Sequence, residues 1–512
     1  MNVVWKSYND SPNRGYWDQQ ILEDLFKEAN HYNDYQKTGS VVIIPGRSHA
    51  DHIKEINKDI QKLPFVILII TGDEEALFPI GEIEHDHIQI WIQTARIEKH
   101  PDYNWLPNGH TPHTKKISGK KQGIFFAGQV THQRRRLAVE AGKALGAEIL
   151  ETEGFTQGWS PKRYNERLNT AQYVLCPSGP VTVDTFRVWE ALEVGAIPIV
   201  DTQTPTEDQS WYWDNLLEDV PFPRVKDWST VGRIIKDMDY QERSLQIRAW
   251  YKRFKIDLKN KFYSQYAKLS GESDRSITVI IPTSPIPSLP KTTIIDETIK
   301  SIRDHIDAQI IVVFDGVRPE QEKFREHYLQ YIDRMLDKDI YPIILKNHQH
   351  QVGATRIALE HVTTPCILFV EHDTPICEEI PFDGLESVIV SGLANVIRLH
   401  HEALILPDHE HLMLDSESQI INGVPLKRSI QWSQRPHMAS TDFYRNMLAT
   451  YFTKEAKSFI EDKMHSVLQT NDGLAGWAKF KLWIYAPDGD MKRSVHLDGR
   501  EGESKFDDRQ QF

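Results

Sequence analysis

The chain has 512 residues, of which 40% are hydrophobic and 26% are charged, as is typical of a soluble globular protein with more than one domain. Its formal net charge of −13 argues against a protein that coats nucleic acid or an anionic membrane. Three widely spaced cysteines indicate buried thiols in a reducing compartment and not a disulfide framework. Because no apolar stretch reaches the roughly 18 to 20 residues of a membrane span, we expect a cytoplasmic protein.

Strands that alternate with helices are predicted for the first subdomain, residues 1–115. Apolar runs at residues 40–45, 65–70 and 88–92 are typical of buried strands. Their spacing predicts a parallel sheet with helices on its faces, which makes the fold class α/β. A loop rich in Pro, Gly, His and Asn then leads into a second subdomain.

The second subdomain, residues 116–270, opens with a predicted strand at 123–128 and a helix that begins at Arg134-Arg135-Arg136. Cationic side chains beside the free N–H groups of a helix start can bind a phosphate. Arginines are unfavourable there unless an anion is present, because the helix dipole is positive at that end. The alternative is an ordinary solvated helix face.

A strand at 173–176 runs into the turn that contains Ser178, and a helix is predicted for 184–194. Arg187 and Glu190 lie three residues apart, so they share one face of that helix. The carboxylate could accept hydrogen bonds from ribose hydroxyls while the arginine binds phosphate. An ordinary surface ion pair is the competing interpretation.

Residues 175–180 (Leu-Cys-Pro-Ser-Gly-Pro) and 187–200 (Arg-Val-Trp-Glu-Ala-Leu-Glu-Val-Gly-Ala-Ile-Pro-Ile-Val) resemble the sugar-nucleotide half of the exostosin-type glycosyltransferases. The resemblance is best over residues 120–235. It implies a GT-B arrangement in which two Rossmann-like subdomains face each other across the active site. Carried over by position, it implies that Arg187 and Glu190 hold the donor nucleotide, with Arg135 or Arg136 near its diphosphate and Ser178 in the same turn.

A third domain, residues 276–512, follows a hydrophilic break. Its first strand, 277–283, ends in Pro282 and Thr283, and its second, 309–314, ends in Asp315 and Gly316. Asp315 could accept from a base or ribose, and Gly316 permits close backbone approach. The next helix begins near Gly353, and we expect Arg356 on it to reach a diphosphate.

The apolar run that starts at Cys366 ends in Glu371-His372-Asp373. Open α/β sheets bind ligands at the carboxyl ends of their strands, so both carboxylates could share one cation there. Mg²⁺ and Mn²⁺ prefer carboxylate oxygens and often use one or two of them together with substrate phosphates. The alternative is an acidic strand end that is simply solvated.

This order of strands and polar ends over residues 276–500 resembles the family 2 glycosyltransferases of the GT-A fold. Glu371-His372-Asp373 stands where that family has an Asp-X-Asp metal motif, so contact of Glu371 with a metal is less secure than that of Asp373. The segment 459–464 (Phe-Ile-Glu-Asp-Lys-Met) matches the family's Glu-Asp pair, which implies Asp462 as the general base beside Glu461. The resemblance also implies His496 as a further ligand of Mn²⁺ or Mg²⁺.

Trp432, Gln434 and Arg435 form a loop whose aromatic and hydrogen-bonding groups suit a sugar acceptor, although a buried aromatic corner would explain Trp432 equally well. His348 and His350 have no partners at metal spacing, and we interpret them as surface residues.

These patterns predict a bifunctional glycosyltransferase that uses nucleotide sugars, with a UDP-sugar favoured as donor and a glycan as acceptor. A nucleic acid acceptor is disfavoured by the acidic balance. Two alternatives remain open: one active transferase whose other half is a nucleotide- or carbohydrate-binding scaffold, and a nucleotidyltransferase.

Overall fold

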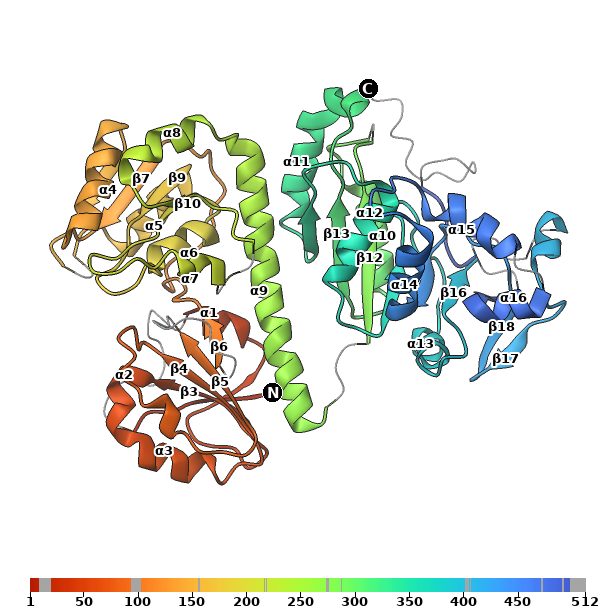
Figure 1. Cartoon of the computed structure of the whole chain (residues 1–512), viewed down its shortest axis with the longest axis horizontal. Coiled ribbons are helices and arrows are strands. Elements are labelled where there is room, and N and C mark those ends of the chain that lie inside the picture. The colour runs from red at the N-terminus through yellow and green to blue at the C-terminus, as the bar shows by residue number, and fades with distance from the viewer. Residues whose placement is uncertain are drawn as a thin grey trace. The chain divides into compact units, whose positions relative to one another are not determined.

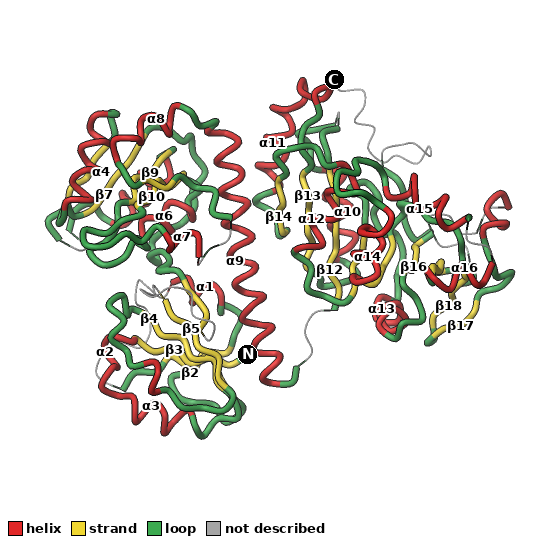
Figure 2. Tube along the Cα trace, in the orientation of Figure 1, coloured by secondary structure: helices red, strands yellow, loops and turns green. Residues whose placement is uncertain are grey.

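The computed structural model describes residues 1–8, 20–93, 103–154, 157–215, 217, 219–272, 276–286, 288–400, 405, 407–470, 473–489 and 492–497. The chain folds into two compact units, Met1–Asp274 and Arg275–Phe512. Figures 1 and 2 show strands enclosed by helices in both units, so the predicted α/β class is confirmed. No helix within these described ranges is long and apolar enough to cross a bilayer.

The first sheet of unit 1 is entirely parallel, with the spatial order β2-β1-β3-β4-β5-β6. Alternate residues of its central strands enter two separate cores, one on each face. This explains why β3 and β4 are continuous apolar runs. The elements are β1 (Asn2–Trp5), α1 (Gln20–Leu25), β2 (Asn30–Tyr32), β3 (Ser40–Pro45), α2 (Gly46–His49), α3 (Ile53–Ile60), β4 (Val66–Thr71), β5 (Ile88–Gln93) and β6 (Tyr103–Leu106).

The second sheet of unit 1 is also parallel, with the order β11-β10-β9-β7-β8. The chain moves from β7 to β8 on one side and then to β9 on the other, so the strand order reverses between β7 and β9. The elements are β7 (Ile124–Gly128), α4 (Gln133–Ala144), β8 (Glu148–Glu151), α5 (Pro161–Thr170), β9 (Tyr173–Cys176), α6 (Phe186–Glu193), β10 (Ile197–Asp201), α7 (Trp211–Asn215), β11 (Arg224–Val225) and α8 (Val231–Lys236).

The long helix α9 (Tyr240–Ser270) packs on both subdomains of unit 1 (Figure 1). Its amino half places Trp250 in the core of the second sheet, and its carboxyl half places Phe262 in the core of the first. The Phe262 ring stacks on Trp91 with the ring centroids 3.9 Å apart. The helix begins at the Asp239 cap and ends at Gly271, whose φ of 77° suits glycine.

Unit 2 is built on one mixed sheet with the order β14-β13-β12-β15-β19-β16-β20-β18-β17. Its first four strands are parallel, and the order reverses between β12 and β15. Strand β19 is antiparallel to both β15 and β16, so the carboxyl ends of β15 and β16 lie at the same edge as the start of β19. The strands are β12 (Ile277–Thr283), β13 (Gln309–Phe314), β14 (Tyr341–Ile344), β15 (Cys366–Phe369), β16 (Val396–Leu399), β17 (Gln419–Ile421), β18 (Val424–Arg428), β19 (His437–Ser440) and β20 (Leu482–Tyr485).

Helices cover this sheet (Figure 2). Several of the predicted site residues lie on them. The helices are α10 (Thr293–Arg303), α11 (Arg325–Met335), α12 (His350–Glu360), α13 (Phe382–Val390), α14 (Thr441–Tyr451), α15 (Ile460–Gln469) and α16 (Gly473–Phe480).

Candidate functional site

Glu371, Asp373 and His496 meet just beyond the carboxyl end of β15. One ligand atom from each residue lies within 4.8 Å of the others, and the Nδ1 atom of His496 is 3.7 Å from Oδ2 of Asp373. Asp373 and His496 are buried, whereas Glu371 is partly exposed. Two carboxylates and one imidazole suit a divalent cation such as Mn²⁺, and part of this set faces solvent, from which a substrate can reach it.

Two local features bring these three side chains together. The chain turns sharply after β15, where the backbone N–H and hydroxyl of Thr374 donate to the Glu371 carbonyl oxygen at 3.2 and 3.1 Å. The segment 493–497 then pairs with residues 373–377, and the Leu497 N–H donates to the Asp373 carbonyl at 2.9 Å. His496 therefore reaches the site through a contact between segments far apart in the sequence.

The amino terminus of α15 is tied to the same place through Gln351. The Gln351 Nε2 atom donates to Oε1 of Glu371 at 3.4 Å, and its Oε1 accepts from the Ile460 N–H at 2.9 Å. Glu461 follows directly and accepts the Gln434 N–H at 3.1 Å, whereas Asp462 is exposed. Both carboxylates of the predicted Glu-Asp pair thus stand on a helix turn that is hydrogen-bonded to a side chain in contact with Glu371.

Asp315, predicted to bind a base or ribose, is hydrogen-bonded to the start of α12. Its Oδ1 accepts the N–H groups of Gly316 and Gln349 at 2.8 and 2.7 Å, and its Oδ2 accepts that of His350 at 3.0 Å. The His348 Nδ1 atom is a further 2.7 Å neighbour of Oδ2. These contacts anchor the start of α12, and the contact of Asp315 with a base or ribose stays a prediction.

The remaining polar ends of β12 and β13 are also used within the protein. A Cβ atom on Gly316 would lie 2.2 Å from the Asn347 carbonyl carbon, so the close approach at this glycine is made by the chain itself. The Thr283 hydroxyl is buried 3.4 Å from the Tyr331 hydroxyl, and Pro282 pairs within the sheet. Gly353 makes room for the side chain of Gln349. All four residues have contacts within the protein, and their role as donor-binding residues stays a prediction.

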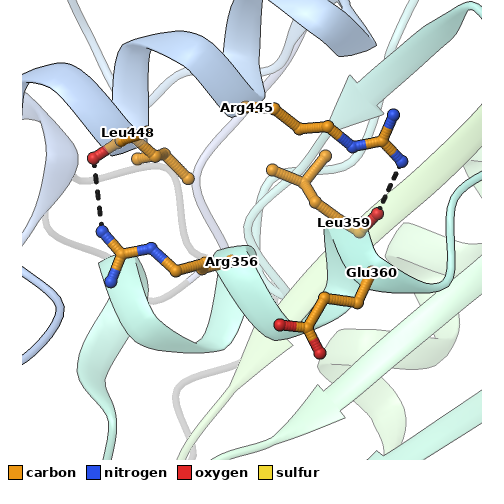
Figure 3. Close-up of a pocket in the computed structure, with 6 residues that line it drawn as sticks. Arg356, Leu359, Glu360, Arg445 and Leu448 are labelled. Carbon is orange, nitrogen blue, oxygen red and sulfur yellow. Dashed lines mark hydrogen bonds between the residues drawn. The ribbon is translucent and has the colours of Figure 1, made fainter.

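Arg356 lies on a pocket between α12 and α14, where its guanidinium group caps α14 (Figure 3). Its Nη2 atom donates to the Leu448 carbonyl at 3.2 Å, and Nη1 donates to the Lys454 carbonyl at 3.1 Å. Arg445 on α14 does the reverse, because it donates to the Leu359 carbonyl near the end of α12 at 2.8 Å. The side chain thus joins two helix ends, and its contact with a diphosphate stays a prediction.

The loop predicted to bind an acceptor divides into a buried and a more open part. Trp432 is 1% exposed and packs against His437 and Tyr444, which fits the buried aromatic corner considered for it, and its role as an acceptor contact stays a prediction. Gln434 and Arg435 are half-buried beside Glu461. The His437 Nδ1–H group donates to the Arg435 carbonyl at 2.8 Å, its Nε2 atom accepts from the Tyr444 hydroxyl at 3.1 Å, and burial lowers its pKa to about 4.

In unit 1, two arginines converge where the strand order reverses between β7 and β9. Arg135 donates from Nε to the Ser178 carbonyl at 3.1 Å and from Nη1 to the Gln129 carbonyl at 3.0 Å. Arg187 donates to the Ala127 carbonyl at 2.7 Å. Burial, followed by the charge of Arg187, lowers the pKa of Arg135 to about 10. Two neighbouring guanidinium groups, each held by backbone carbonyls, fit a bound anion.

Gly128 and Ser178 shape this arginine pair. A Cβ atom on Gly128, whose φ is +145°, would lie 2.2 Å from Nη2 of Arg187, so only glycine admits the guanidinium there. The Ser178 hydroxyl is buried and finds no hydrogen-bond partner in the described part of the chain. Both features place polar or positive groups at the predicted nucleotide edge.

The other predicted residues of unit 1 lie elsewhere. Glu190 is buried and accepts hydroxyl groups from Thr111 at 3.0 Å and Tyr164 at 2.6 Å, so it joins the inter-subdomain loop to the second sheet. Glu190 is therefore not part of a surface ion pair, and its ribose role stays a prediction. Arg136 is exposed on α4, away from the carbonyls that bind Arg135.

Several residues of these sites have no clear sequence signal. Gln351 is found only when the first turns of α12 and α15 are brought together. His348, interpreted as a surface residue, lies on the Asp315 carboxylate. Arg398, a buried arginine whose pKa burial lowers to about 10 despite the nearby charge of Glu461, stands in a strand that sequence analysis did not specify.

Residues 151–268 match the family described as "RXYLT1 C-terminal domain". Ribitol-5-phosphate xylosyltransferase 1 of Homo sapiens is 28% identical over 125 residues, which cover 20% of this chain and 28% of that protein. The chain thus matches less than a third of the length of this curated relative. The exostosin-type resemblance itself stays a prediction.

Solved glycosyltransferase structures also align with part of the chain. The crystal structure of S. aureus TarS 1-349 is 16% identical, with a TM-score of 0.30, and the alignment covers 44% of this chain and 61% of TarS 1-349. Mannosyltransferase PcManGT from Pyrobaculum calidifontis, in complex with GDP-Man and Mn²⁺, is 11% identical with a TM-score of 0.26, over 48% of this chain and 68% of its own.

Proposed function

We propose that this chain is a glycosyltransferase that uses nucleotide-sugar donors and has a cation-dependent site in unit 2. The observation that carries the proposal is the meeting of Glu371, Asp373 and His496 beside the point where the strand order reverses. The similarity of residues 151–268 to a xylosyltransferase domain supports the same class of activity for unit 1. We favour a UDP-sugar as donor and a glycan hydroxyl as acceptor.

In unit 2, Asp373, His496 and Glu371 would hold Mn²⁺ or Mg²⁺, which when bound neutralises charge on the leaving diphosphate. Asp462 would take the proton of the acceptor hydroxyl, because its exposed carboxylate stands on the turn that Gln351 links to Glu371. General base catalysis of this kind contributes roughly 10²- to 10⁴-fold. Glu461 would fix the acceptor loop through the Gln434 N–H.

In unit 1, Arg135 and Arg187 would bind a second nucleotide diphosphate without a metal. Their placement at the strand-order reversal, between two parallel-sheet subdomains, supports a GT-B-like arrangement for unit 1 beside a GT-A-like unit 2. Two active sites on one chain would raise the local concentration of a shared intermediate, which favours successive additions to one glycan.

Hydrolysis of a panel of nucleotide sugars by the full chain, with Mn²⁺ and with EDTA, tests this function. We expect release of a nucleoside diphosphate that depends on Mn²⁺ and disappears in Asp373→Asn, with a metal-independent remainder that disappears in Arg187→Gln. Loss of only one component would favour the single-transferase alternative with a scaffold half. Release of pyrophosphate instead would identify a nucleotidyltransferase.

A further inference from the structure

Gln351 is a buried amide whose two ends are both engaged at the cation site of unit 2. It is 7% exposed and occupies the second position of α12. The Ile460 N–H can only donate, so its partner must be the amide oxygen of Gln351. The amide NH₂ group then faces the Glu371 carboxylate, which can accept. The chemistry of both partners thus fixes the orientation of this amide.

A second hydrogen bond joins the same two segments. The Val352 N–H donates to the Ser458 carbonyl at 3.2 Å, one residue along from Gln351 on α12 and two residues before Ile460. The first turns of α12 and α15 are therefore held together by two bonds. One is between backbone groups and survives substitution of side chains, whereas the other depends entirely on Gln351.

We propose that Gln351 is a positioning residue that couples the cation site to the turn of α15 that carries Glu461 and Asp462. This rests on the function proposed for unit 2. A side chain that hydrogen-bonds to a metal-binding carboxylate fixes the orientation of that carboxylate. Here Gln351 also accepts the Ile460 N–H at the start of α15, which would otherwise lack an intrahelical acceptor. A shift in the position of the Glu371 carboxylate on cation binding would therefore move the Gln351 amide and, with it, the Ile460 N–H.

The test is a Mn²⁺ titration of the full chain, followed by electron paramagnetic resonance. Gln351→Met keeps the volume and removes both hydrogen bonds, and we expect Mn²⁺ affinity to fall roughly 10- to 100-fold. Glu371→Gln should weaken binding as well, and Gln351→Met added to it should cause little further loss because both act through one carboxylate. Gln349→Met, at the amino-terminal cap of the same helix with its side chain against Gly353, is the matched control and should bind Mn²⁺ like wild type.

Hydrogen exchange of residues 458–464 gives a second readout that does not depend on activity. Mn²⁺ should slow exchange there in the wild type and not in Gln351→Met. If Gln351→Met does not fold, Gln351→Asn keeps a buried amide that is one methylene too short to span both partners, and the same losses are expected.

The possible results distinguish the coupling through Gln351 from the function proposed for unit 2. If the wild type binds Mn²⁺ and Gln351→Met binds it with the same affinity, the coupling is overturned and the proposed function stands. The same holds if the losses of affinity in the two single variants simply add in the double variant. A wild type that binds no Mn²⁺ overturns both.

Discussion

Asp462 is the proposed general base of unit 2. It is exposed on the first turn of α15, whereas its neighbour Glu461 is engaged by the Gln434 N–H. Asp462→Asn should abolish the Mn²⁺-dependent sugar transfer of unit 2, because the amide cannot take a proton, yet leave the affinity for UDP with Mn²⁺ nearly unchanged. Turnover and UDP binding by calorimetry measure the two effects, with exposed Asp442→Asn as control. Normal turnover in Asp462→Asn would remove it as the base.

His437 should give unit 2 an acid-sensitive stability. Burial lowers its pKa from 6.5 to about 4, so between these values the unfolded chain binds a proton that the folded chain does not. The free energy of unfolding should therefore fall by about 3 kcal/mol as pH drops from 7 to 4. His437→Phe keeps the ring between Phe369 and Tyr444 and should lose this part of the pH dependence. Urea unfolding at several pH values measures the free energy of unfolding of both proteins. If it falls equally with pH in the wild type and in His437→Phe, the prediction is contradicted.

Two arginines join helices α12 and α14 through hydrogen bonds to backbone carbonyls. Arg356 and Arg445 each cap the other helix, so Arg356→Ala should leave carbonyl groups at the end of α14 without partners. We expect unit 2 to lose about 1–3 kcal/mol while Mn²⁺ affinity stays unchanged. Urea unfolding measures the loss, with Arg325→Ala, a surface pair with Glu322, as control. A lower affinity for UDP in Arg356→Ala, with unchanged stability, would support the predicted contact of Arg356 with a diphosphate.

The predictability of these elements follows from how they are buried. Strands β3, β4, β12 and β13 could be read from the sequence because both of their faces are covered, which demands continuous apolar runs. The strands from β16 onward are short and pair in mixed directions, so no such pattern marks them. The Glu371 and Asp373 pair was visible as a strand end, whereas the roles of Asp315 and Arg356 depended on which helix ends lay nearby. Helix ends are set by tertiary packing, which composition does not encode.

At the scale of the whole molecule, the two proposed sites should be separable within one chain. Gly128→Ala forces a Cβ atom onto the Arg187 guanidinium and should remove metal-independent UDP binding by unit 1. Mn²⁺ binding by unit 2 should persist, because the two units have separate cores. Gly119→Ala is the control, since no atom lies within 4 Å of the added Cβ. Calorimetry with EDTA and with Mn²⁺ measures both, and joint loss would argue against independent sites.

The central claim is that Glu371 and Asp373, at the edge of the unit 2 sheet, bind a cation together with a nucleotide diphosphate. Mn²⁺ binding by the full chain, with and without UDP, tests it most directly in the wild type and in Asp373→Asn. The account predicts one Mn²⁺ site in unit 2 that UDP tightens and that Asp373→Asn removes. A wild type that binds no Mn²⁺ in the presence of UDP, or an Asp373→Asn variant that binds it equally well, would contradict the account.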